Sequence, residues 1–206
     1  MGRVGLLGGT FNPPHIGHLV CASEARDQLG LDVVRLVPAA VPPHKEVPAD
    51  PGAAVRLELC RLAVAGDGGL EVSPIELDRP GPSFTVDTLR ALHDHAPEDE
   101  LTFIVGGDQA HGLPAWREPE AVLELARLAV AEREEVRRLD VLERLDGLRG
   151  VPERVDFFDM PRLDVSSTLL RRRVAAGRPI RHLVPDAVAE RIATLGLYGV
   201  EQAAWA

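Results

Sequence analysis

Short apolar runs alternate with longer amphipathic stretches along most of the chain. The runs are too short for helices and rich in Val, Leu and Ile, so they predict β-strands, while the longer stretches predict helices. We predict strands at Val4–Leu7, Val33–Val37, Leu70–Val72, Leu101–Val105, Leu128–Val130 and Val155–Phe158. We predict helices at Leu19–Leu29, Ala53–Ala65, Val86–His95, Glu120–Ala126 and Val136–Leu148. This alternation is typical of an α/β fold, here a Rossmann-like doubly wound parallel sheet.

The alternation of strands and helices stops near residue 160. Ser166–Ala176 and Pro185–Leu195 predict two closing helices with no strand between them. We therefore expect a single domain over residues 1–206, with a Rossmann-like core at 1–160 and a small C-terminal helical part at 161–206. The proline-rich segment Pro38–Pro51 predicts an irregular loop beside the site. The charged stretch Glu134–Gly150 predicts a solvated surface helix.

A glycine-rich turn, Gly8–His18, follows the first predicted strand and leads into the first predicted helix. Glycines let the backbone approach a ligand, and the N–H groups at a helix start favour an anion. His15 and His18 are three residues apart and would face the same phosphate chain. Neither the Walker lysine nor the dinucleotide fingerprint occurs, and no third ligand with metal-like spacing lies near the histidines. The turn therefore predicts a nucleotide triphosphate site without a protein metal site.

Four further features of the sequence could contact a nucleotide, and each has a plainer alternative. Asp164–Arg173 carries hydroxyls at a helix start and arginines one turn later, which suits a phosphate clamp or a capped helix with a solvated basic face. Asp108, after a strand and two glycines, could bind ribose hydroxyls or merely form a turn. Trp116 could stack on a ligand base or pack in the core. The hydroxyls of Pro82–Thr88 could simply cap a helix.

Charge and composition exclude several classes of function. The net charge of −9 argues against nonspecific binding to nucleic acid or to anionic membranes. No signal peptide is evident, and no apolar run approaches the ~18–20 residues of a membrane span. Cys21 and Cys60 lie in apolar, helix-like surroundings, so we expect buried thiols in a reducing cytoplasm. Lys45 is the only lysine among the 23 lysine and arginine residues, which favours a role for a compact point charge at this position.

Taken together, the motifs resemble those of the nucleotidyltransferase superfamily with the T/HxGH signature, and most closely the bacterial nicotinate-nucleotide adenylyltransferases. The matching segments occur in the same order over nearly the whole length: Gly8–His18, Pro38–Lys45, Ser83–Thr88, Phe103–Asp108 with Trp116, Ser166–Arg171 and Leu197–Tyr198. The resemblance implies a reaction in NAD biosynthesis in which ATP and nicotinate mononucleotide give nicotinate adenine dinucleotide and pyrophosphate. It also implies Mg²⁺, held mainly by the substrate phosphates.

The resemblance implies roles for individual residues. The catalytic residues would be His15, His18, Lys45 and Arg171. The ATP-binding residues would be Gly8, Gly9, Thr10, Phe11, His15, His18, Gly106, Asp108, Ser167, Thr168 and Arg171. The residues binding nicotinate mononucleotide would be Lys45, Thr85, Trp116 and Arg133, with the tryptophan stacking on the ring. Since the attacking phosphate monoester is already an anion, catalysis needs positioning and charge neutralisation rather than a base or a covalent intermediate.

The chain departs from the family's usual pattern at three places. Asn12 stands where Asp is usual, Val55 precedes Arg56 where His-Arg is common, and Ala131–Arg138 lacks the usual Arg-Pro-Gly. Two other functions stay open on sequence grounds: a sister adenylyltransferase that uses nicotinamide mononucleotide or phosphopantetheine, and a noncatalytic nucleotide-binding regulator. We expect no nucleic acid or membrane partner, and a homo-oligomer is compatible with the sequence.

Overall fold

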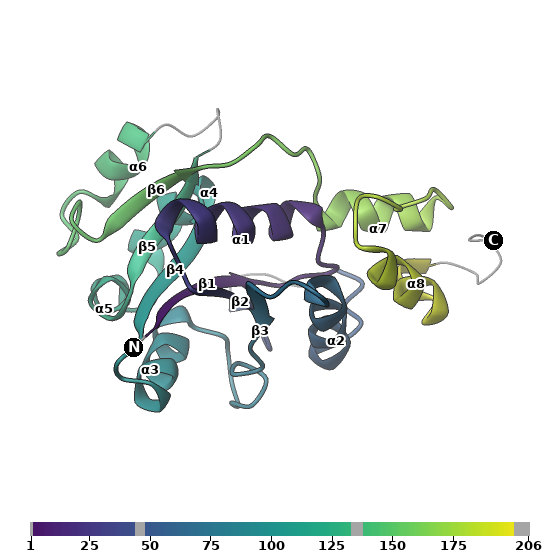
Figure 1. Cartoon of the computed structure of the whole chain (residues 1–206), viewed down its shortest axis with the longest axis horizontal. Helices are drawn as coiled ribbons and strands as arrows, with labels where there is room; N and C mark the ends of the chain where they lie inside the picture. Colours follow the sequence, from purple (N-terminus) through teal and green to yellow (C-terminus); the bar gives the residue numbers. More distant parts are fainter. Residues whose placement is uncertain (1, 44–47, 133–137, 200–206) are drawn as a thin grey trace.

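The computed structural model describes residues 2–43, 48–132 and 138–199. They contain a parallel six-stranded sheet in the order β3-β2-β1-β4-β5-β6 (Figure 1). The strands are β1 (Arg3–Gly9), β2 (Val33–Pro38), β3 (Leu70–Val72), β4 (Glu100–Gly106), β5 (Arg127–Glu132) and β6 (Val155–Asp159). The predicted fold class and all six predicted strands are confirmed.

The helices lie between the strands and beyond the last one. They are α1 (Ile16–Leu29), α2 (Ala53–Val64), α3 (Thr85–His95), α4 (Gly107–Gly112), α5 (Pro119–Leu125), α6 (Arg138–Leu145), α7 (Ser167–Ala175) and α8 (Asp186–Thr194), with short 3₁₀ turns η1 (Leu113–Ala115) and η2 (Leu197–Gly199). Successive strand residues point to opposite faces, so Leu6 packs with α3 and α5 while Leu7 packs with α1. Burial of both faces explains the continuous apolar runs of the central strands β1, β4 and β5.

The sheet order reverses between β1 and β4, and both strands end near the same edge. Leu7 of β1 is paired with Ile104 of β4, so the two strands end side by side. The β1–α1 turn leaves the end of β1, and α4 leaves the end of β4, on the opposite face of the sheet. Ligands of open α/β sheets bind in the crevice at such a reversal. The topology therefore places the Gly8–His18 turn and Asp108 on opposite sides of one crevice.

The C-terminal helices α7 and α8 lie at one end of the molecule (Figure 1). They share an apolar cluster with α2, in which Leu59 of α2 packs with Leu170 and Val174 of α7 and Val188 of α8, all at most 1% exposed. Because α2 is anchored on the sheet, this packing fixes the start of α7 close to the β1–α1 turn.

Three sequence predictions need correction. Helix α1 begins at Ile16 rather than Leu19, so His18 lies within it. Asp108 lies in α4, not in an open turn. Helix α6 is exposed on its charged face, as predicted, but it is not solvated all round, because Val141 and Leu145 are buried in the core beneath it. Among the described residues, none of the helices combines the length and apolar character needed to cross a membrane.

Candidate active site

The β1–α1 turn is tightly packed on its own side chains. Phe11 adopts a left-handed φ of 50° and is 2% exposed, so its ring lies inside the turn. Gly17 is buried against His15, and a Cβ there would lie 3.1 Å from the His15 Nδ1 and 3.1 Å from a Val165 methyl. Glycine at position 17 therefore lets the histidine and the segment before α7 approach α1 closely.

The His18 ring is held in one orientation by its neighbours in the turn. His15 is the N-cap of α1, and its backbone N–H donates to the Nδ1 of His18 at 3.1 Å. The two imidazole rings stack with centroids 3.7 Å apart, and the Phe11 ring meets His18 edge-on at 4.8 Å. Because Nδ1 accepts a hydrogen bond, the ring proton lies on Nε2, which is then a donor.

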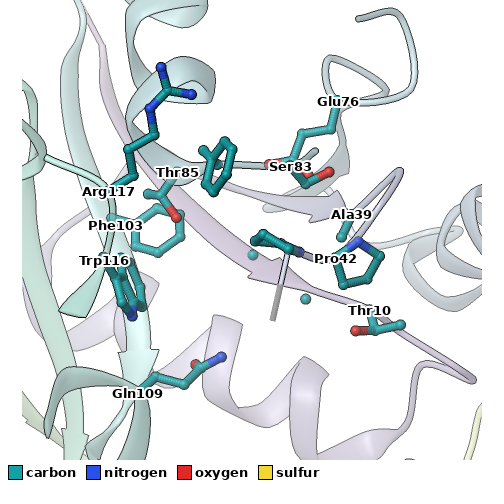
Figure 2. Close-up of a pocket in the computed structure, with 14 residues that line it drawn as sticks. Thr10, Ala39, Pro42, Glu76, Ser83, Thr85, Phe103, Gln109, Trp116 and Arg117 are labelled. Carbon is teal, nitrogen blue, oxygen red and sulfur yellow. The ribbon is translucent and has the colours of Figure 1, made fainter. Parts of the chain in front are cut away.

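Two cavities meet at this turn. The larger, of about 520 Å³, is lined by all eleven residues predicted to bind ATP: Gly8, Gly9, Thr10, Phe11, His15, His18, Gly106, Asp108, Ser167, Thr168 and Arg171. The smaller, of about 280 Å³, is lined by Thr85 and Trp116 together with Phe84, Phe103 and Arg117 (Figure 2). The structure thus brings the whole predicted ATP set and two of the four residues predicted to bind nicotinate mononucleotide into adjoining spaces. Lys45 and Arg133 lie outside the described residues.

The start of α7 is docked on the turn by hydrogen bonds. Ser166 accepts from the backbone N–H of Leu169 at 3.1 Å, so it is a helix cap, as the plainer alternative had it. Ser167 Oγ donates to the carbonyl of Pro13 at 2.8 Å, and Arg171 Nη1 donates to the carbonyl of Asn12 at 2.7 Å. These contacts hold the hydroxyls and the guanidinium at the mouth of the larger cavity.

Comparison with known proteins identifies the family. A family described as cytidylyltransferase-like matches residues 6–173. A protein of Roseiflexus sp. (strain RS-1), named "probable nicotinate-nucleotide adenylyltransferase", is 46% identical over 95% of this chain and 97% of its own length. One of the same name from Thermus thermophilus is 45% identical over 95% of this chain and 99% of its own length. The chain belongs to the nicotinate-nucleotide adenylyltransferase family. It is therefore a nucleotidyltransferase.

Solved structures support the family's fold. A Plasmodium falciparum nicotinic acid mononucleotide adenylyltransferase complexed with NaAD superposes with a TM-score of 0.78, covering 96% of this chain and 98% of that one. A structure of the same protein complexed with APC gives a TM-score of 0.76 over the same shares. At 15% and 14% sequence identity these likenesses concern the fold.

Asn12, one of the departures from the family pattern, joins three segments around the site. It is 2% exposed; its Nδ2 donates to the Pro48 carbonyl at 3.0 Å, and its Oδ1 accepts from the Tyr198 hydroxyl at 2.7 Å. Burial raises the pKa of Tyr198, which keeps this hydroxyl protonated as a donor. A carboxylate could accept from Tyr198 but could not donate to Pro48, so the amide is the side chain that makes both contacts.

Arg56 of α2 is a structural centre of the site that the sequence analysis did not single out for a role. It is fully buried, and its guanidinium donates to the carbonyls of Thr10 at 2.9 Å, Ala39 at 2.6 Å and Ala40 at 3.2 Å. Its Nε pairs with Asp50 at 2.9 Å. Arg56 therefore ties the β1–α1 turn to the residues after β2. Its one sequence signal is an arginine among the apolar positions of α2.

Glu76 and Ser83 form a second network beside the smaller cavity (Figure 2). Ser83 Oγ accepts from the backbone N–H of Ala40 at 2.9 Å, and Glu76 accepts from Thr88 Oγ1 at 2.7 Å. Glu76 is 8% exposed, and its burial raises the pKa of the carboxyl despite hydrogen bonds from Ser83 and Thr88 and the nearby charge of Arg79. Ionised Glu76 is thus disfavoured by folding.

The raised pKa of Glu76 predicts a pH-dependent effect of Glu76→Gln. Because the pKa is higher in the folded than in the unfolded protein, the wild type loses free energy of unfolding as pH rises through the folded value, and the amide variant does not. We expect the stability of the variant relative to wild type to increase from pH 5 to pH 8 in urea unfolding. The exposed Glu124→Gln is the control, and a relative stability of Glu76→Gln that falls with pH would contradict this account.

Within the described ranges, no three His, Cys, Asp or Glu side chains are grouped so that they could hold a metal ion. The larger cavity instead offers backbone N–H groups, hydroxyls, imidazoles and one guanidinium. Such donors suit an anionic ligand with several phosphate oxygens. A metal ion there would have to take most of its ligands from that anion.

Proposed function

We propose that this chain transfers the adenylyl group of ATP to nicotinate mononucleotide, giving nicotinate adenine dinucleotide and pyrophosphate in NAD biosynthesis. The observation that carries the proposal is the junction of the two cavities at the β1–α1 turn: one is lined by the whole predicted ATP set and the other by Thr85 and Trp116. The names of the family relatives and the NaAD complex of the Plasmodium falciparum protein support it.

The chemistry needs little from the protein beyond binding and charge neutralisation. The phosphate of nicotinate mononucleotide is an anionic nucleophile that attacks the α-phosphorus of ATP, so no protein base has to activate it. As the bond to pyrophosphate breaks, negative charge grows on the phosphate oxygens, and fixed donors stabilise it. We assign this role to His15, the His18 Nε2–H and Arg171, with the backbone N–H groups of Gly9 and Thr10 binding the same phosphates.

Magnesium fits this donor set as an ion bound mainly to substrate phosphates. No carboxylate cage is present among the described side chains, and Mg²⁺ commonly keeps water and phosphate oxygens as its ligands. When bound, it would neutralise phosphate charge. Lys45 and Arg133 stay predicted contacts to nicotinate mononucleotide. A cytoplasmic location stays a prediction, and the buried thiols of Cys21 and Cys60 support it. A homo-oligomer also stays a prediction.

Trp116→Ala should weaken binding of nicotinate mononucleotide specifically. Trp116 lines the smaller cavity, and its ring meets Phe103 edge-on at 6.0 Å, which leaves a face for a pyridine ring. Loss of one base–aromatic stack costs about 1–3 kcal/mol, so the KM for nicotinate mononucleotide should rise roughly 5–150-fold while that for ATP changes little. Trp116→Phe, which keeps a stacking surface, is the control. An equal rise in both KM values would contradict the assignment.

The direct test is to incubate the purified chain with ATP, Mg²⁺ and nicotinate mononucleotide and to identify the product by mass spectrometry. We expect nicotinate adenine dinucleotide and an equal amount of pyrophosphate. Pyrophosphate or phosphate released without dinucleotide would indicate hydrolysis and contradict the proposal. Binding of ATP without any product would favour the noncatalytic regulator.

A further inference from the structure

Gln109 lies where the two cavities join. Its side chain lines both of them, a property it shares with Gly8, Gly9 and Thr10 of the phosphate turn. Gln109 belongs to α4, after β4, so it approaches the junction from the side opposite the turn. Figure 2 shows its carboxamide directed toward the middle of the smaller cavity.

The orientation of the Gln109 carboxamide follows from its hydrogen bond. Its Oε1 accepts from the backbone N–H of Gly106 at 3.4 Å. An amide nitrogen only donates, so the reverse orientation would place two donors against each other. The Nε2 with its two N–H groups is therefore the part of the side chain that faces the junction. Gln109 is exposed, so a ligand can reach these donors.

The junction is also where the proposed reaction has to occur. ATP and nicotinate mononucleotide would occupy different cavities, yet the bond that forms joins the phosphate of one to the α-phosphate of the other. Both phosphates must then lie between the turn and α4. The backbone of Gly9 and Thr10 borders this space on one side, and the Gln109 amide borders it on the other.

We propose that Gln109 is a further catalytic residue, whose Nε2–H groups donate to phosphate oxygens at the point where the two substrates react. This inference rests on the proposed function. A donor at that point binds most strongly when charge moves onto the phosphate oxygens, so it lowers the barrier more than it strengthens ground-state binding. Its loss should therefore reduce kcat and leave both KM values nearly unchanged.

Two substitutions separate this role from its alternatives. Gln109→Glu keeps an oxygen that can accept from Gly106 N–H, and so keeps the helix cap, but it removes the donors. Gln109→Met has a similar length and no charge, and it removes both the cap and the donors. His111→Glu adds the same charge to an exposed position of α4 that lines neither cavity, and it is the matched control.

The experiment measures kcat and the KM for each substrate, with thermal unfolding of every variant. We expect kcat to fall roughly 10–100-fold in both Gln109 variants, the range for losing one hydrogen bond to a charged group, while His111→Glu stays within twofold. If kcat falls in Gln109→Met alone, Gln109 acts only as a helix cap, and if kcat falls in Gln109→Glu alone, the effect is only charge repulsion. Either result overturns the proposal. A change in KM without a change in kcat also overturns it. A wild type that forms no dinucleotide would refute the proposed function itself.

Discussion

His18→Ala should lower turnover by roughly 10²–10³, which is the range for losing one donor aimed at developing negative charge. The structure fixes the orientation of that ring: the His18 Nδ1 accepts from the His15 backbone, the rings stack at 3.7 Å, and His18 lines the larger cavity. The donor needs no rearrangement when the transition state forms. The loss should therefore appear in kcat, with a smaller change in the KM for ATP.

Two replacements at the same position sharpen the test. Glutamine can place an amide N–H near the position of the imidazole Nε2, whereas asparagine reaches only as far as Nδ1. We expect His18→Gln to keep part of the lost activity and His18→Asn to resemble His18→Ala. His93→Ala, at an exposed site of α3 that lines neither cavity, should stay within twofold of wild type. A loss of less than threefold in His18→Ala would refute the assigned role.

Arg56→Ala should destabilise the protein by about 3–5 kcal/mol and lower kcat/KM by more than about tenfold, because it removes a fully buried guanidinium that is hydrogen-bonded to three backbone carbonyls and paired with the partly exposed Asp50. The substitution removes donors from the carbonyls of Thr10, Ala39 and Ala40 and leaves Asp50 without its buried partner. Each buried acceptor left unsatisfied costs about 1–3 kcal/mol. Activity should fall because the Thr10 carbonyl holds the backbone that presents N–H groups to phosphate. Urea unfolding and steady-state kinetics measure the two effects.

Arg56→Lys separates charge from geometry. An ammonium keeps the charge but cannot match the planar fork that spans three carbonyls and a carboxylate, so most of the loss should remain. The control is Arg191→Ala, which removes a partly exposed ion pair with Glu58 and should cost less than about 1 kcal/mol. Equal destabilisation by Arg56→Ala and Arg191→Ala would contradict the account.

The central strands were predictable because β1, β4 and β5 are buried on both faces, which leaves a continuous apolar run such as Val4–Leu7 in the sequence. Helix α4 was missed because six residues are too few to show a helical period, and its glycines predict a turn. Helix α6 looked solvated because its two buried residues, Val141 and Leu145, are few among charged neighbours. The pattern of apolar and polar residues therefore located helices and strands well when they were long or fully buried.

The grouping of the candidate site residues was predictable to a different degree. The ATP set came from short segments whose resemblance to a family was strong, and the topology brings all eleven residues to one cavity. Arg56, Asn12 and Gln109 were not assigned roles, because their functions depend on partners distant in sequence or on which cavity they border. Tyr198 and Asn12, for instance, are separated by 186 positions yet share a 2.7 Å hydrogen bond.

The central claim is that the second substrate is nicotinate mononucleotide. The most direct test is pyrophosphate release at fixed ATP with nicotinate mononucleotide, nicotinamide mononucleotide and phosphopantetheine supplied in turn. The account predicts that kcat/KM is highest for nicotinate mononucleotide, and that the dinucleotide is its product. No product with nicotinate mononucleotide, or a higher kcat/KM with either of the other two, would contradict it.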